Sequence, residues 1–528
     1  MTGTWTLVRA YLRRDRFFVL WWWIGGVLLY WSQAVSVIGL YATQAEFDRA
    51  ADYMGANPAF IALAGPARAL NTVGGQVTWQ ASAFGAILAG LMSMFLIGRH
   101  TRAEEESGRD ELVRSTVVGR QAPLAAAVIV AAAANLVLGI AVALSLVAVP
   151  LAAADSFGLG LGLTATGWVF TATALIAAQL SSSTRAMYGI AGVVIAASYV
   201  LRAVGDVGNP VFTWLSPIGW YQAMYPFSGL RWWPLLLLLA AAAIAALVAV
   251  ALLSRRDIGS GLLSSRAGPA RAGGVLGGHG FRGGLGLAWR LHRGTMLGWT
   301  LGMFLVGLSY GSIGNDVEQL LGDSDFARDF MIQGTADLID GFYATAALML
   351  ALGASGYAIS SVLRPGAEEV VGHTELLVAT DLSRRAWLAG HVAMTVVGTV
   401  MVLGVSGLGL GLGNALVTGA GDAVGRYFWL GLAYVPAVLA LAAVARLLFG
   451  LAPGQVSLAW LPLVLAVVVM LFSTVLRIPQ WVQNLSPFEH LALVPAESLS
   501  WSAVLAVGLV ATLVSFAGQL AFWRRDIG

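Results

Sequence analysis

Long apolar runs alternate with short polar stretches along the whole chain. Runs of this length can cross a hydrocarbon core of about 30 Å as helices, and they lack the alternation of transmembrane β-strands. The pattern therefore predicts twelve membrane-spanning helices. We expect them at residues 17–40, 78–99, 122–150, 158–180, 184–204, 231–253, 295–315, 340–363, 386–413, 426–450, 455–475 and 501–523.

The segments between these spans differ in character. Residues 3–16 form a basic amphipathic lead-in that we expect to lie in the membrane interface. Residues 41–76 suit an external connection with one short helix. Residues 205–230 and 479–500 mix chain breakers with interfacial aromatics, which predicts short helices that dip into the outer leaflet without crossing it.

Several short stretches of the first half recur in order in the second. Arg-Arg-Asp-Ile-Gly stands at 255–259 and again at 524–528, and Leu-Ser-Pro stands at 215–217 and 485–487. Such ordered landmarks predict a tandem duplication. We expect an all-α polytopic membrane protein with two parallel six-helix halves, at 1–258 and 285–528, joined by a glycine-rich cytosolic linker at 259–284.

The densest charge in the first half lies between Arg102 and Arg120, directly after one apolar run and before another. The same pattern recurs in the second half, with each matched residue the same number of positions later in the chain. The recurring residues are Glu104, Glu105, Gly108, Glu111, Leu112 and Arg120, matched by Glu368, Glu369, Gly372, Glu375, Leu376 and Arg384.

Composition limits the chemistry that the chain can perform. The chain has 528 residues, of which 58% are hydrophobic and 11% are charged, so it is not a soluble globular protein. It contains no cysteine, and every residue in its Lys+Arg total of 30 is arginine. These absences exclude a phosphate-binding loop with its lysine, a catalytic thiol and a thiolate metal site. Any ATPase that drives this protein must be another chain.

The distribution of arginine predicts the orientation. With both termini, both charged segments and the linker inside, only Arg49, Arg68, Arg202, Arg231, Arg328, Arg426 and Arg477 fall outside. This is the positive-inside pattern. We therefore expect a multi-pass protein of the bacterial cytoplasmic membrane with both termini in the cytosol.

Two interpretations of the charged segments compete. They are either solvated cytosolic loops or coupling elements that dock on a partner subunit and pass its motion to the spans. Their acids run against the positive-inside trend, and their pattern is kept in both halves, which favours coupling. Glu104 and Glu111, like Glu368 and Glu375, would share one helix face if the helix continued through the intervening glycine.

The order of lead-in, span, external loop, span, Glu-x-x-x-Gly-x-x-Glu-Leu segment and four further spans resembles the permease of an ABC-2-type ABC transporter. The duplicated form, with Asn57-Pro58-Ala59 and Gly65-Pro66 in the first external loop, resembles actinobacterial permeases of the tetronasin-resistance or polyketide-antibiotic exporter kind. In that family a glycine followed by threonine opens the coupling helix. Gly108-Arg109-Asp110 and Gly372-His373-Thr374 depart from this pattern, the first more than the second. This difference predicts that the two halves bind their ATPase subunits unequally.

The resemblance implies the partners and the transport path. Two copies of a separate ABC ATPase would bind ATP and Mg, with no cofactor in this chain, and a hydrophobic or amphipathic small molecule would move outward across the membrane. Spans two and five of each half would line its path. The candidates there are Trp79, Phe84, Met92, Met94, Phe95, Tyr199, Tyr343, Met349, Tyr357 and Met470, any of which could instead pack against helices or lipid.

The alternatives are a proton-coupled secondary multidrug transporter, an exporter of lipid or cell-envelope precursors, and a membrane-embedded enzyme. Proton coupling generally needs ionisable groups deep in the membrane, and every acid lies at or outside the expected interface. The six histidines are scattered with no metal-like pair, and no nucleophile, base and acid constellation stands out. We therefore expect a transport subunit that is not an enzyme, binds no metal and does not bind nucleic acid.

Overall fold

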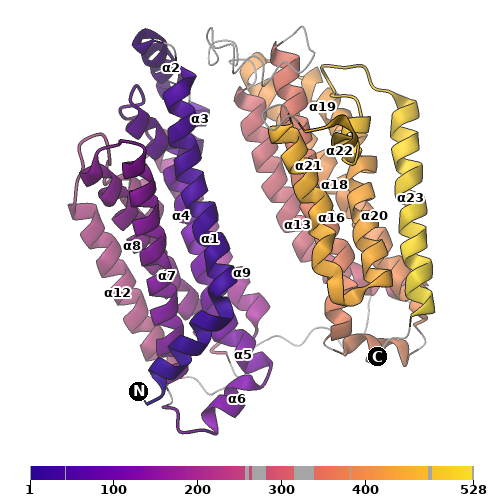
Figure 1. Ribbon diagram of the computed structural model, residues 1–528, viewed down its shortest axis with the longest axis horizontal. Helices are drawn as coiled ribbons and strands as arrows, with labels where there is room; N and C mark the ends of the chain where they lie inside the picture. The colour runs from indigo at the N-terminus through magenta and orange to yellow at the C-terminus, as the bar shows by residue number, and fades with distance from the viewer. Residues whose placement is uncertain are drawn as a thin grey trace. The chain divides into compact units, whose positions relative to one another are not determined.

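The computed structural model describes residues 2–41, 43–56, 58–119, 121–255, 261–263, 281–313, 338–370, 372–380, 382–473 and 478–525. Within these ranges the chain forms helices and connecting loops and contains no β-strand (Figure 1). It divides into two compact units, Met1–Ala267 and Gly268–Gly528. That boundary falls inside the expected linker, most of which lies outside the described residues.

The first unit follows the predicted spans closely. Its helices are α1 (Thr4–Leu40), α2 (Gln44–Ala56), α3 (Pro58–Ala64), α4 (Val73–His100), α5 (Arg102–Glu106), α6 (Arg109–Arg114), α7 (Ala122–Ala148), α8 (Ala153–Leu180), α9 (Thr184–Val207), α10 (Val211–Trp214), α11 (Pro217–Gln222) and α12 (Trp233–Ser254). The external connection contains two helices, α2 and α3, where one was expected. The segment 205–230 contains the short helices α10 and α11.

The second unit has a corresponding order of elements. They are α13 (Phe281–Ile313), α16 (Leu338–Val370), α17 (His373–Val378), α18 (Arg384–Thr418), α19 (Asp422–Ala433), α20 (Val435–Leu451), the 3₁₀ helix η2 (Pro453–Trp460), α21 (Leu461–Phe472), α22 (Gln480–Gln483), the 3₁₀ helix η3 (Pro487–His490) and α23 (Trp501–Arg524). The twelve-span repeat layout itself stays a prediction.

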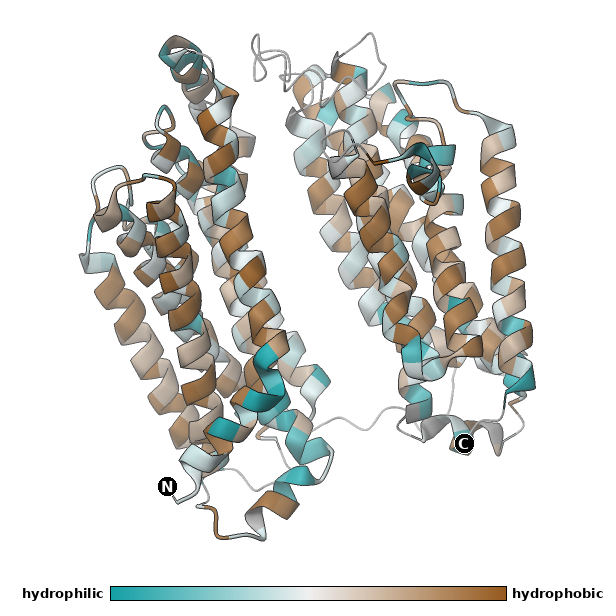
Figure 2. Cartoon of the chain, viewed as in Figure 1, coloured by the Kyte–Doolittle hydropathy of each residue, from teal (hydrophilic) through white to brown (hydrophobic). Residues whose placement is uncertain are grey.

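The described residues contain 11 segments long and apolar enough to cross a membrane, six in the first unit and five in the second. Figure 2 shows the hydrophobic colouring along these helices. Hydrogen bonds within each helix satisfy its backbone groups where lipid offers no partner. The fold class is therefore confirmed as an all-α polytopic membrane protein. At the place of the expected seventh span lies α13, which is 33 residues long and carries several arginines near its start.

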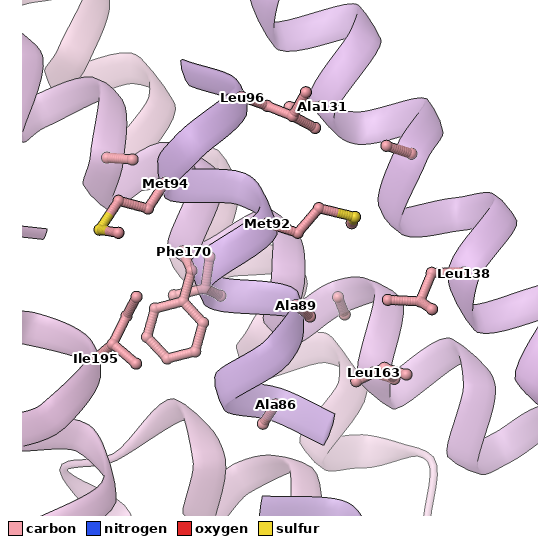
Figure 3. Packing of buried hydrophobic residues seen from close by; sticks show 14 of the residues in the cluster. Ala86, Ala89, Met92, Met94, Leu96, Ala131, Leu138, Leu163, Phe170 and Ile195 are labelled. Carbon is pink, nitrogen blue, oxygen red and sulfur yellow. The ribbon is translucent and has the colours of Figure 1, made fainter. Parts of the chain in front are cut away.

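The core of the first unit forms around α4 and α8. In their most apolar windows 72% and 78% of residues are buried, against 11% in α12, whose side chains mostly face outward. In Figure 3 Phe170 lies beside Ile195, and Met92 points away from them toward the helix that carries Leu138. Small side chains such as Ala86 and Ala89 let the helices approach closely.

The second unit relies on glycine for its tightest helix contact. A Cβ built on Gly311 of α13 would lie 2.0 Å from the backbone oxygen of Leu410 of α18, and one on Gly409 would lie 2.3 Å from that of Phe304. Only glycine permits this backbone approach. Close packing of small residues holds membrane helices together without a hydrophobic driving force.

Three features differ from the expected layout. The lead-in is not a separate interfacial helix, because no breaker separates it from the first span and α1 runs unbroken from Thr4 to Leu40. The span expected at 426–450 is divided into α19 and α20 at Tyr434, where Pro436 opens the second helix. The span expected at 455–475 begins as the 3₁₀ helix η2, with a kink at Gln455.

Candidate coupling surface

The first charged segment forms a sharp bend below α4. The helix ends at His100, α5 follows after Thr101, and Gly108 then adopts a left-handed conformation with φ +73° before α6. Left-handed backbone is costly for side chains with a Cβ, which explains a glycine at this position. The result is a six-residue helix held apart from the end of the span.

The second charged segment ends in the same local structure. Here α16 continues without a break through Glu368 and Glu369 as far as Val370, beyond the expected end of the span at 363. Gly372 has φ +76° and precedes the six-residue helix α17. The two units thus present matching short helices after matching left-handed glycines.

The shared-face expectation for the carboxylates is wrong. It required an unbroken helix through Gly108 and Gly372, and both glycines are left-handed and break the helix. The acids before each glycine therefore belong to a different element from those after it. The structure separates the segment into an anchored part and an exposed part.

The anchored part of the first copy is held by arginines of the same chain. Glu104 accepts hydrogen bonds from Arg14 of α1 and, at 3.1 Å, from Arg109 Nε. Glu105 accepts one at 2.9 Å from Arg102, which is buried and donates from Nε to the backbone oxygen of Ala178 at 2.6 Å. These contacts fix α5 against α1 and the end of α8.

Glu106 adds a contact that the sequence did not single out. Its carboxylate accepts hydrogen bonds from the backbone N–H (2.9 Å) and the hydroxyl of Thr184, the first residue of α9. An acid at a helix N-terminus satisfies an otherwise unpaired N–H group. A movement of α5 would therefore reach α9 directly.

The anchored part of the second copy uses a different arginine. Glu369 accepts a hydrogen bond from Arg525 Nη2 (2.5 Å), just past the end of α23. The same guanidinium donates to the backbone oxygen of Phe449 at 3.2 Å and lies over the rings of Phe449 and Phe522. The first segment is thus tied to α1, and the second to α20 and α23.

The exposed part consists of four side chains on the short helices. Glu111 and Leu112 on α6 are exposed, and so are Glu375 and Leu376 on α17. Leu112 is 70% and Leu376 72% accessible. An exposed leucine beside an exposed acid, repeated at matching positions, is a surface that a partner could cover. We call α6 and α17 with these four side chains the docking helices.

Two predicted site residues add little to this picture. Arg120 lies outside the described residues. Arg384 begins α18 and is half-buried, while the neighbouring Ser383 caps that helix by accepting from the backbone N–H of Ala386 at 3.2 Å.

Most of the proposed path residues are engaged within their own unit. Met92, Tyr343 and Tyr357 are fully buried, and Phe95 and Met470 pack against the cores. Phe84 is 41% accessible. Hydrogen bonds join Trp79 to the oxygen of Gly65 (2.6 Å), Tyr199 to Leu63 (2.8 Å), Tyr343 to Gly311 (3.0 Å) and Tyr310 to the sulfur of Met349 (3.3 Å). A path through these positions stays a prediction.

A buried acid in α1 was missed from the sequence. Asp15 is fully buried, bonds to His100 Nε2 and lies 3.3 Å from Arg99 Nη1. Tyr11 stacks on the His100 ring at 3.9 Å. The sequence spacing could have indicated its burial. Residues 8, 11, 15 and 19 follow helical spacing and form part of the buried stripe of α1.

The structure also pairs two of the scattered histidines. His292 Nε2 and His391 Nδ1 lie 2.9 Å apart, and His292 Nδ1 lies 3.1 Å from Ser361 Oγ, which bonds to Thr395. The ring nitrogens face each other at hydrogen-bond distance and leave no space for a metal ion between them. Among the described residues no group of three or more metal-binding side chains occurs.

Comparison with known proteins supplies the family. Residues 281–523 match the model of the C-terminal domain of the multidrug efflux system permease Rv1217c. The chain is 38% identical over 530 aligned positions to the multidrug efflux system permease protein Rv1217c of Mycobacterium tuberculosis, and the match covers 100% of this chain and 95% of that protein. The chain therefore belongs to the Rv1217c family of multidrug efflux permeases.

Proposed function

We propose that this protein is the transmembrane subunit of an ATP-driven exporter. It moves hydrophobic or amphipathic drug-like molecules outward across the bacterial cytoplasmic membrane. Two copies of a separate ABC ATPase bind ATP and Mg and dock on α6 and α17 from the cytosol. The observation that carries this proposal is the matched pair of docking helices, each placed by a left-handed glycine and each exposing a glutamate and a leucine.

The geometry of the first docking helix suits transmission of force. Docking on α6 would press on α5, which is tied to α1 through Arg14, to α8 through Arg102 and to α9 through Glu106. Charge-assisted hydrogen bonds such as these are short and directional, so they transmit displacement with little slack. A conformational change of the docked ATPase would therefore be transmitted to these three spans together.

The second docking helix has a different support. Its segment is linked by Arg525 to α20 and α23. The unequal grip expected from the two glycine motifs is consistent with these unequal anchors. One ATPase would act chiefly through α1, α8 and α9, and the other through α20 and α23.

Co-purification and transport together test the proposal. The tagged full-length chain is purified from its native membrane and then reconstituted with any co-purifying ATPase. We expect an ABC ATPase in about twofold excess over the permease, and drug export that needs ATP and stops with vanadate. Export that persists with vanadate and collapses with the proton gradient would instead establish the secondary-transporter alternative.

A further inference from the structure

A groove lies between α20 and α23, near the C-terminal ends of both helices. It has a volume of about 590 Å³ and is lined by Leu447, Gly450, Leu451, Ala517, Leu520, Ala521, Arg524 and Arg525. The apolar residues occupy the part that lies within the two spans. The two arginines stand together at the end of α23.

The shape of this groove depends on a close helix crossing. A Cβ on Gly450 would lie 2.3 Å from the backbone oxygen of Gly518, so the helices touch through their backbones there. Leu451 is 65% accessible beside this crossing. Leu451 thus projects from the crossing as one wall of the groove.

The charged end of the groove is strongly basic. Arg524 is exposed and has no ion pair to another described residue. Arg525 is half-buried and already holds Glu369. Arg385 lies near the same end, with its guanidinium 4.9 Å from the ring centre of Trp523. Among the described residues at this end, the three arginines outnumber Glu369, the acid that Arg525 holds.

We propose that this groove binds an anionic phospholipid, with an acyl chain along the leucines and the headgroup phosphate on Arg524. Basic pockets between membrane helices at the cytosolic face suit anionic lipid headgroups, and guanidinium is well matched to phosphate. The apolar part of the groove matches the acyl chain, and its basic end matches the phosphate of the headgroup. With the docking helices on the cytosolic side, as in the proposed function, this lipid lies in the inner leaflet.

This site is adjacent to the second coupling segment. Arg525 lines the groove and also bonds to Glu369, at the end of α16 and just before Gly372 and α17. A phosphate on Arg524 would lie next to Arg525, the arginine that holds Glu369, and would compete with Glu369 for its positive charge. Lipid occupancy would therefore adjust the support of α17 and leave that of α6 unaffected.

The absence of cysteine from the chain makes a direct test possible. Leu520→Cys on the groove wall carries a fluorophore, and the full chain is placed in phosphatidylcholine nanodiscs without any ATPase. A small fraction of spin-labelled phosphatidylglycerol or spin-labelled phosphatidylcholine is then added. We expect the anionic lipid to quench the groove label more strongly, by about the fivefold preference that one arginine near a membrane surface provides.

Four further variants make the result specific. Arg524→Gln abolishes the preference, and Arg524→Lys keeps most of it. Arg255→Gln, at the corresponding end of α12, leaves it unchanged. A label at Leu247→Cys, on the exposed side of α12, shows no preference. Equal quenching by both lipids at Leu520, or a preference that survives Arg524→Gln, would overturn the proposal. Because no ATPase is present, this outcome is independent of the proposed export function.

Discussion

At the scale of single residues, burial distinguishes acids that hold the protein together from acids that are available to a partner. Glu104 and Glu369 share one sequence pattern with Glu111 and Glu375, yet the first pair bonds to arginines of the same chain while the second pair is exposed. Sequence spacing alone could not separate them, because the break at each glycine depends on a single backbone angle.

The exposed leucines of the docking helices give the first prediction. Leu112→Ser or Leu376→Ser should weaken binding of the ATPase by about tenfold, because burying a leucine against a partner contributes roughly 1.5 kcal/mol or more. The permease alone should keep its melting temperature, since both side chains face water. Titration of the purified ATPase onto reconstituted permease measures the affinity.

Leu416→Ser is the matched control for these variants. Leu416 is 78% accessible and lies near the end of α18 that is farther along the chain from α17. It should leave the affinity unchanged. Equal loss of affinity in all three variants would show that the leucines act through general stability and not through docking.

The left-handed glycines give the second prediction. Gly372→Ala has space for its Cβ but incurs roughly 1–2 kcal/mol of backbone strain at φ +76°. The strain should displace α17 and reduce drug-stimulated ATP hydrolysis. Gly372→Asn should retain most of it, because asparagine tolerates this conformation. Equal activity of the two variants would mean that the bend is unimportant for coupling.

At the scale of helices, apolar runs predict most spans to within a few residues. The expected 184–204 and 501–523 correspond to α9 (Thr184–Val207) and α23 (Trp501–Arg524). The discrepancies occur where the ends of a helix make contacts with other helices. The lead-in is continuous with α1 and places Asp15 against His100 of α4, and α16 continues past its apolar run to Glu369, which bonds to Arg525.

The crossing of α20 and α23 gives a prediction at this scale. Gly450→Ala should destabilise the second unit by about 1–3 kcal/mol, because the added methyl group would overlap the backbone oxygen of Gly518. A lower melting temperature in detergent would record this. Gly425→Ala in α19 meets nothing within 4 Å and should be neutral or slightly stabilising. Two equal melting temperatures would contradict the close crossing.

At the scale of the whole molecule, the membrane class and the family follow from the sequence, whereas the proposed ATP-driven mechanism needs a second protein. A chain without lysine cannot build the usual phosphate-binding loop, so energy from ATP would have to reach it through contact with another protein. The candidate path residues could not be judged from sequence, because buried packing and lining a path favour the same aromatic and methionine side chains. The docking helices lie within the two charged segments that the sequence singled out, and their role in coupling stays a prediction.

Cross-linking from the docking helices tests the central claim most directly. Single cysteines replace Leu112 or Leu376 in the cysteine-free chain and carry a benzophenone, and Leu416→Cys serves as the control. After illumination of native membranes, we predict a covalent adduct between the permease and an ABC ATPase from both docking positions and none from the control. Labelled permease that yields no ATPase adduct from either docking helix, while still exporting drug, would contradict the account.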